Sequence, residues 1–304
     1  MAYLDLVKLG KNHWWRYVLG VLLIVLMWQG LGLLPTVALA IWVELDQNDT
    51  TLFNTETLLF EGLPMEVIFA DFMGMFLFLW LGVFLVVCFL HNRPFWSLFT
   101  PLQRLSWRRV LHGAVVFAAI YLAVGVIMEW LFPTPAKDIE YVLQPGKFLA
   151  FLPLALLLIP IQTSAEELLF RGYFMQGLGL IMNRWGVALV SSVLFALPHL
   201  LNPEVSDANL WIAFLPYWII GLLLALITLR DGTLELALGV HASNNLMAFL
   251  LVTVPPYDMF PSVFVYHGEL FTWATVVNGA VVAVLFYWVI FRFFARSVPI
   301  TEVS

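Results

Sequence analysis

Long apolar stretches, separated by short polar segments, run through almost the whole chain. Eight of them predict helices, with approximate limits at 17–43, 67–89, 110–132, 148 onward, 185–200, 210–229, 234–254 and 270–294. A helix of about 20 apolar residues is long enough to cross the hydrocarbon core of a bilayer. The pattern therefore predicts an all-α, polytopic membrane protein with about eight transmembrane helices in one bundle.

Two of these stretches are irregular. The first contains Pro35, where we expect a kink, because proline has no N–H and its ring clashes with the preceding turn. The fourth begins near Phe148 and has no clear end before Asn183. At about 1.5 Å per residue it would be roughly 50 Å long, against a hydrocarbon core of roughly 30 Å. We therefore expect it either to break near Gly172 or to extend beyond the bilayer.

Basic residues are unevenly distributed between the connecting segments. If the N-terminus is cytoplasmic and the helices alternate, eleven basic residues are cytoplasmic and two, Lys137 and Lys147, are outside, with Arg171 counted as intramembrane. Cytoplasmic loops of membrane proteins carry such an excess. We therefore predict eight spans in the plasma membrane with both chain ends in the cytoplasm. The eleven are Lys8, Lys11, Arg16, Arg93, Arg104, Arg108, Arg109, Arg184, Arg230, Arg292 and Arg296.

Composition narrows the function further. Hydrophobic residues make up 62% of the chain and charged residues 11%, with a net charge of −6 and no basic cluster, so nucleic acid is not an expected partner. The single cysteine, Cys88, excludes an intrachain disulfide. Residues 91–109 mix arginines with aromatic residues, which is typical of a segment at the headgroup level. We expect residues 1–304 to form a single integral membrane domain.

An acidic pair, Glu166 and Glu167, follows the apolar run of the fourth stretch, with Arg171 one turn later. A charge at the bilayer centre costs about 2.5 to 3.5 kcal/mol, so this segment is a candidate functional site. On a helix Glu167 and Arg171 share a face and are expected to pair, whereas Glu166 points about 100° away, toward a cavity. The alternative is a salt bridge at a helix end on the membrane surface.

Two further polar motifs lie in later apolar stretches. Phe195 and His199 are four residues apart and share a face, as do His241 and Asn245. Taken alone, His199 is an interfacial or core histidine, and the second pair is equally consistent with hydrogen bonding between helices. Counted along the helices at about 1.5 Å per residue, however, the motif residues reach a similar depth of roughly 15 to 25 Å. A shared depth favours one common site.

These residue types are suited to hydrolysis. Glu166 with His199 could hold and deprotonate a water as general base. His241 and Asn245 could donate hydrogen bonds to the oxyanion of a tetrahedral intermediate, and such donors matter most in a dry site. The sequence has no Gly-x-Ser-x-Gly and no His-Glu-x-x-His motif.

The three motifs, Glu-Glu-x-x-x-Arg, Phe-x-x-x-His and His-x-x-x-Asn, in this order and on separate predicted helices, resemble the CPBP family. This family comprises type II CAAX prenyl endopeptidases and bacteriocin-processing or immunity proteins. The resemblance covers about residues 148–250, which we expect to be the catalytic core. It implies an intramembrane endopeptidase that acts on a membrane-associated or lipidated peptide.

The resemblance also implies roles for individual residues. Glu166 would be the catalytic glutamate, His199 would help it activate water, and His241 and Asn245 would form the oxyanion hole. The remaining motif positions would support the site; they are Glu167, Arg171 and Phe195.

Two kinds of alternative stay open. The first is chemical: Glu166, His199 and His241 could instead bind zinc as a metalloprotease. We prefer a mechanism without a metal cofactor, because the spacings follow no familiar zinc signature and Asn245 is an indifferent zinc ligand. The second is functional: a non-catalytic immunity or scaffold protein could keep the same residues, and a proton-coupled transporter could use intramembrane Glu and His as a relay. No inverted repeat supports a transporter.

Overall fold

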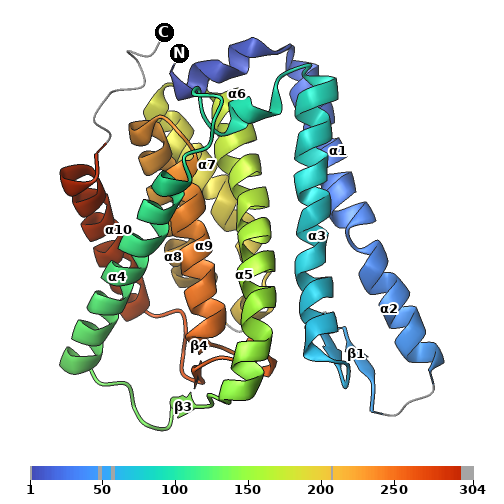
Figure 1. Ribbon diagram of the computed structural model, residues 1–304, viewed down its shortest axis with the longest axis vertical. Coiled ribbons are helices and arrows are strands. Elements are labelled where there is room, and N and C mark those ends of the chain that lie inside the picture. Colours follow the sequence, from blue (N-terminus) through green and yellow to red (C-terminus); the bar gives the residue numbers. More distant parts are fainter. Residues whose placement is uncertain (1, 47–49, 56–58, 207, 296–304) are drawn as a thin grey trace.

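The predicted apolar stretches are helical in the structure, a computed structural model that describes residues 2–46, 50–55, 59–206 and 208–295 (Figure 1). Within these residues, six helical segments are long and apolar enough to cross a membrane: Trp14–Leu45, Met65–Leu90, Trp107–Leu131, Pro145–Leu178, Leu210–Asp231 and Trp273–Phe293. Two further helices, α7 (Arg184–His199) and α9 (Glu235–Leu250), have 16 residues each. The all-α, polytopic membrane fold is confirmed, whereas the count of eight spans stays a prediction. Arg296 and both chain ends lie outside the described residues.

The first predicted stretch consists of α1 (Trp14–Val25), a π-helical segment (Leu26–Leu31) and α2 (Leu34–Leu45). Pro35 lies in the first turn of α2, where its missing N–H breaks no helical hydrogen bond. The irregular backbone therefore precedes the proline. Together with α3 (Met65–Leu85), which continues as a π-helical turn to Leu90, these helices form one side of the bundle (Figure 1).

The fourth stretch is one continuous helical segment of 34 residues, Pro145–Leu178. It consists of α5 (Pro145–Glu167), a π-helical segment (Leu168–Phe174) and α6 (Met175–Leu178). The expected break near Gly172 is absent from these described residues: the helix widens there, and a Cβ on Gly172 would already lie 3.2 Å from the Leu98 side chain. At about 1.5 Å per residue the segment exceeds a hydrocarbon core of roughly 30 Å. The second of the two expectations, that the segment extends beyond the bilayer, therefore stays as a prediction.

In the other half of the bundle, α9 is the central helix. It packs against α5, against α4 (Trp107–Leu131) and against α8 (Leu210–Asp231), while α10 (Trp273–Phe293) covers α4 and α8 on the outside (Figure 1). Glycines let α4 and α9 approach closely, because a Cβ on Gly239 would lie 2.0 Å from the Val110 carbonyl oxygen. This close packing fixes the depth and rotation of α9 and so the position of its motif residues.

The segment that follows α3 differs from the prediction of a headgroup-level surface segment. Arg104 and Arg108 are exposed, but Arg93 and Arg109 are each only 5% exposed. A short 3-10 helix, Phe95–Leu98, packs against the segments Tyr3–Leu9 and Leu168–Phe174, and Leu98 is fully buried. These two arginines are therefore not on the protein surface, because acceptors inside the fold replace the water that their guanidinium groups would otherwise require, and the headgroup depth of the segment stays a prediction.

Short strands and 3-10 turns, none of which the apolar pattern predicts, organise the loops. The strands lie at the end of the bundle opposite α6 (Figure 1). They are β1 (Leu52–Asn54) paired with β2 (Leu59–Glu61), and β3 (Ile139–Tyr141), β5 (Phe264–Tyr266) and β4 (Val252–Thr253) in that spatial order. The other 3-10 helices are Tyr3–Leu9, Pro203–Val205 and Tyr257–Met259.

Candidate active site

The acidic pair of α5 is buried at the centre of the bundle. Glu166 is 6% exposed, and Glu167 and Arg171 are fully buried. Arg171 Nη1 lies 2.9 Å from Glu167 Oε1, and its Nη2 donates to the Gly221 carbonyl of α8 at 3.0 Å. The predicted pair is therefore present. The pair is enclosed by the bundle rather than exposed to solvent.

His241 of α9 contacts both carboxyl groups. Its Nδ1 lies 2.8 Å from Glu167 Oε1, and its Nε2 lies 3.4 Å from Glu166 Oε2. Glu166 is thus left unpaired by Arg171 and meets His241 from another helix, as expected, because the close packing of α9 brings an imidazole between the two acids. The predicted donor, His241, is thus in direct contact with the predicted base.

Charge balance limits the protonation of this cluster. Two carboxylates and the guanidinium of Arg171 sum to −1, and one additional proton shared by Glu166 and His241 makes the group neutral. Burial of an uncompensated charge is strongly unfavourable, so the neutral group is the favoured one.

Several polar atoms of this cluster have no hydrogen-bond partner within the described residues. They are Glu166 Oε2, Glu167 Oε2 and Arg171 Nε, all of which are buried. Leaving a buried donor or acceptor unsatisfied costs about 1–3 kcal/mol, so native proteins keep few of them. Their concentration in one place favours a site that engages a polar ligand.

Asn245 lies one turn beyond His241 and is half-buried. Its Nδ2 donates to Gln162 Oε1 at 3.0 Å, and its Oδ1 accepts from Asn244 Nδ2 at 3.1 Å. An amide nitrogen carries two N–H groups, so one is left for a ligand. Gln162 is absent from the predicted site, yet it precedes Glu166 by four residues and so shares its helix face. That spacing was the signal that could have identified it.

His199 is half-buried and reaches the cluster through Phe195. The Phe195 ring centroid lies 4.6 Å from that of His199 and 5.5 Å from that of His241. His199 Nδ1 lies 2.8 Å from the Phe195 carbonyl oxygen. A carbonyl only accepts, so Nδ1 carries the proton and Nε2 of the neutral ring is an acceptor. Among the described residues, no direct contact joins His199 to Glu166.

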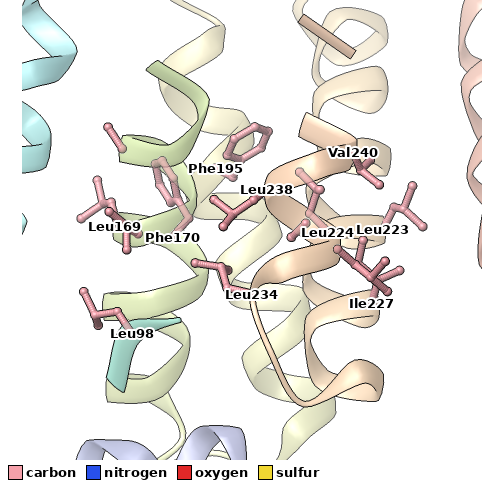
Figure 2. Close-up of a cluster of buried hydrophobic side chains, with 14 of the residues drawn as sticks. Leu98, Leu169, Phe170, Phe195, Leu223, Leu224, Ile227, Leu234, Leu238 and Val240 are labelled. Carbon is pink, nitrogen blue, oxygen red and sulfur yellow. The ribbon is translucent and has the colours of Figure 1, made fainter. Parts of the chain in front are cut away.

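A hydrophobic shell surrounds the polar cluster. Figure 2 shows Phe170 and Phe195 together between the helices, and their ring centroids lie 5.3 Å apart at an interplanar angle of 88°. Leu234, Leu238 and Val240 of the α9 region belong to the same buried cluster (Figure 2). Aliphatic and aromatic walls of this kind lower the local dielectric constant and strengthen every hydrogen bond inside.

The alternative zinc ligands do not form one group. Glu166 and His241 lie side by side, but within the described residues no three side chains of His, Cys, Asp or Glu are grouped so that they could hold a metal ion. A catalytic zinc site uses three protein ligands, so these residues in this arrangement do not fit zinc.

One family model and one relative match this chain. Residues 145–247 match the family described as "Type II CAAX prenyl endopeptidase Rce1-like". The chain is also 32% identical over 260 residues to "Uncharacterized protein YyaK" of Bacillus subtilis (strain 168), and the match covers 84% of each chain. No solved structure matches. The matched range contains all three motifs, on α5, α7 and α9.

Proposed function

The chain belongs to the CPBP family of intramembrane proteases, and from this membership we propose that it is an endopeptidase in which Glu166 activates the hydrolytic water. The observation that carries the proposal is the buried contact between Glu166 and His241, 3.4 Å apart inside an apolar bundle. The catalytic core is residues 148–250, and the protein is an integral membrane protein, which we place in the plasma membrane.

The proposed reaction begins with a water held at Glu166. Its oxygen attacks the peptide carbonyl carbon while a proton passes to Glu166 Oε2, which has no hydrogen-bond partner within the described residues beyond its 3.4 Å contact with His241. The tetrahedral intermediate then collapses, the C–N bond breaks, and the proton on Glu166 moves to the leaving nitrogen. The products are a carboxylic acid and an amine, and Glu166 returns to its starting state.

Other residues of the site support this step. The second N–H of Asn245 and a ring N–H of His241 donate to the oxyanion, where each such donor stabilises the transition state by about 2.7–4 kcal/mol. Glu167 and Arg171 hold His241 in place through the bond at its Nδ1. The Nε2 lone pair of His199 accepts a hydrogen bond from the second O–H of the water.

The substrate is a membrane-associated or lipidated peptide. This class follows from the family and from the burial of the site within the bundle, because such a peptide can reach a base at this depth without leaving the bilayer. No residue of the site points to a prenyl group on the substrate.

The test compares membrane peptides from cells that carry the wild type with those from cells that carry Glu166→Ala or Glu166→Gln. We expect both variants to be folded and inserted but inactive, with cleavage reduced about 10²–10⁴-fold, because neither side chain can take a proton. Glu129→Gln is the matched control, since Glu129 is an exposed carboxylate on α4. Normal cleavage by Glu166→Gln would remove Glu166 as the base. Ion transport by reconstituted vesicles, without any cleavage, would favour the transporter instead.

A further inference from the structure

Buried arginines of this protein fall into two kinds. Arg171 and Arg109 each contact a carboxylate, at 2.9 Å and 2.6 Å respectively. Arg93 is equally buried, at 5% exposed, but within the described residues it has no carboxylate partner. Buried charges are nearly always paired, so the exception needs an explanation.

The contacts of Arg93 leave part of its guanidinium available. Its Nε donates to Ser97 Oγ at 2.6 Å, and its Nη2 donates to Gln176 Oε1. Both acceptors are neutral, and Nη1 makes no hydrogen bond within the described residues. Burial lowers the pKa of Arg93 to about 10, which still leaves it cationic at neutral pH. Arg93 is therefore a buried cation without a carboxylate partner within the described residues, and its Nη1 has N–H groups left to donate to an anion.

A second arginine, Arg16, contacts the same short segment of chain that carries Arg93. Arg16 of α1 donates through Nη1 to the Leu90 carbonyl oxygen, three residues before Arg93, and its Nε is buried without a partner among the described residues. Arg93 follows His91 by two residues, and Arg16 contacts the carbonyl of Leu90, the residue before His91. Burial lowers the pKa of that histidine, the bond to the Lys11 carbonyl opposes this, and both arginines lower it further. Each arginine thus has one guanidinium nitrogen without a hydrogen-bond partner within the described residues, and both contact or belong to the short segment 90–93.

The position of this pair is that of lipid headgroups. Trp14 and Trp15, next to Arg16 in sequence, are 77% and 43% exposed, and Arg16 lies 4.5 Å over the Trp15 ring. Exposed tryptophans at a helix end mark the membrane interface. The distribution of basic residues predicts that this end of α1 and α3 is cytoplasmic, and the cytoplasmic leaflet is rich in anionic lipid.

We propose that Arg16 and Arg93 bind the phosphate of an anionic phospholipid at the predicted cytoplasmic end of α1 and α3. A phosphodiester offers the oxygen acceptors that a guanidinium fork recognises. Through Gln176 the bound phosphate connects to α6, the end of the same helical segment that carries Glu166. The site is distinct from the catalytic cluster and does not depend on proteolysis.

Native mass spectrometry and thermal unfolding of the full chain in a neutral detergent test the proposal, with short-chain phosphatidylglycerol, phosphatidylcholine and inorganic phosphate as the probes. We expect phosphatidylglycerol alone to bind and to raise the unfolding temperature. In the variant Arg16→Gln/Arg93→Gln, the apparent Kd for phosphatidylglycerol should rise about tenfold or more, the equivalent of one lost charged hydrogen bond. Stabilisation by inorganic phosphate as large as by the lipid would overturn the lipid assignment.

Two further variants keep the test decisive. Arg104→Gln/Arg108→Gln removes the same charge from exposed positions of the same connecting segment. If it weakens phosphatidylglycerol binding equally, the effect is diffuse electrostatics and the proposal fails. If Arg93→Gln does not fold, Arg93→Lys keeps the charge and removes the planar fork, and unchanged lipid affinity in that variant would also overturn the proposal.

Discussion

Two clusters of buried charge in this protein are built from the same residue types but differ in completeness. Near the predicted cytoplasmic end, Arg109 of α4 donates through Nε and Nη2 to Asp231 Oδ1, at 3.0 Å and 2.6 Å, and Thr233 donates to Asp231 Oδ2 at 2.7 Å. None of its buried polar atoms lacks a partner within the described residues. In the cluster around Glu166, three buried polar atoms lack one.

This difference distinguishes an ion pair with a structural role from a cluster suited to catalysis. A pair that only joins helices is most stable when every donor and acceptor is satisfied, as at Arg109 and Asp231. The central cluster keeps spare groups at a cost of about 1–3 kcal/mol each, which selection for stability alone would remove. A general base requires an acceptor that is free to take a proton, and Glu166 Oε2 is such an acceptor.

The largest expected effects come from breaking each pair. Glu167→Ala and Asp231→Ala each leave a buried arginine without its carboxylate, so the free energy of unfolding should fall by about 3–5 kcal/mol in both. Only Glu167→Ala should also lose turnover per folded molecule, because His241 loses the acceptor at Nδ1. Denaturant unfolding and cleavage rates, with exposed Arg104→Ala as a control, measure the two effects. Full turnover by Glu167→Ala would make the central pair purely structural.

The next effect concerns the oxyanion donor. Asn245→Ala should lower kcat about 10²–10³-fold with little change in KM, since its N–H acts mainly in the transition state. Asn244→Ala is the matched control, because within the described residues Asn244 donates to Asn245 Oδ1 alone and has no direct role in the proposed mechanism. Equal losses of kcat in both variants would indicate a packing effect instead.

A smaller effect is expected at Gln162, which orients the Asn245 amide. Gln162→Leu should raise the activation free energy by the value of one hydrogen bond, about 0.5–1.5 kcal/mol, and so lower kcat about two- to tenfold. In an Asn245→Ala background the same change should cost little more, because the two residues act together. The rates of the single and double variants measure this coupling, and fully additive losses would contradict it.

The smallest expected effect is that of metal removal. Exhaustive chelation should leave the cleavage rate unchanged, because the Glu166 mechanism needs no metal ion and the zinc donors are not grouped. Enzyme assayed before and after chelation, and after addition of zinc, provides the measurement. A rate that falls on chelation and returns with zinc would replace our mechanism with the metalloprotease alternative.

Contacts within one helix could be predicted from the sequence. The spacing of four placed Glu167 against Arg171, and the structure has that pair at 2.9 Å. The apolar stretches fixed which segments are helical, since a bilayer leaves the backbone few other ways to satisfy its hydrogen bonds. The spacing also placed Phe195 and His199 on one face, where their rings now lie 4.6 Å apart.

Contacts between helices were decided only by the tertiary structure. His241 lies 74 positions from Glu167, and Asn245 lies 83 from Gln162, so no periodicity relates them. Their meeting depends on the depth and rotation of α9, which the close approach at Gly239 sets. The sequence by itself determined the fold class and the motif residues. Which acid meets which histidine, and which buried arginine lacks a carboxylate, depended on packing, because side chains from separate helices meet only when the bundle assembles.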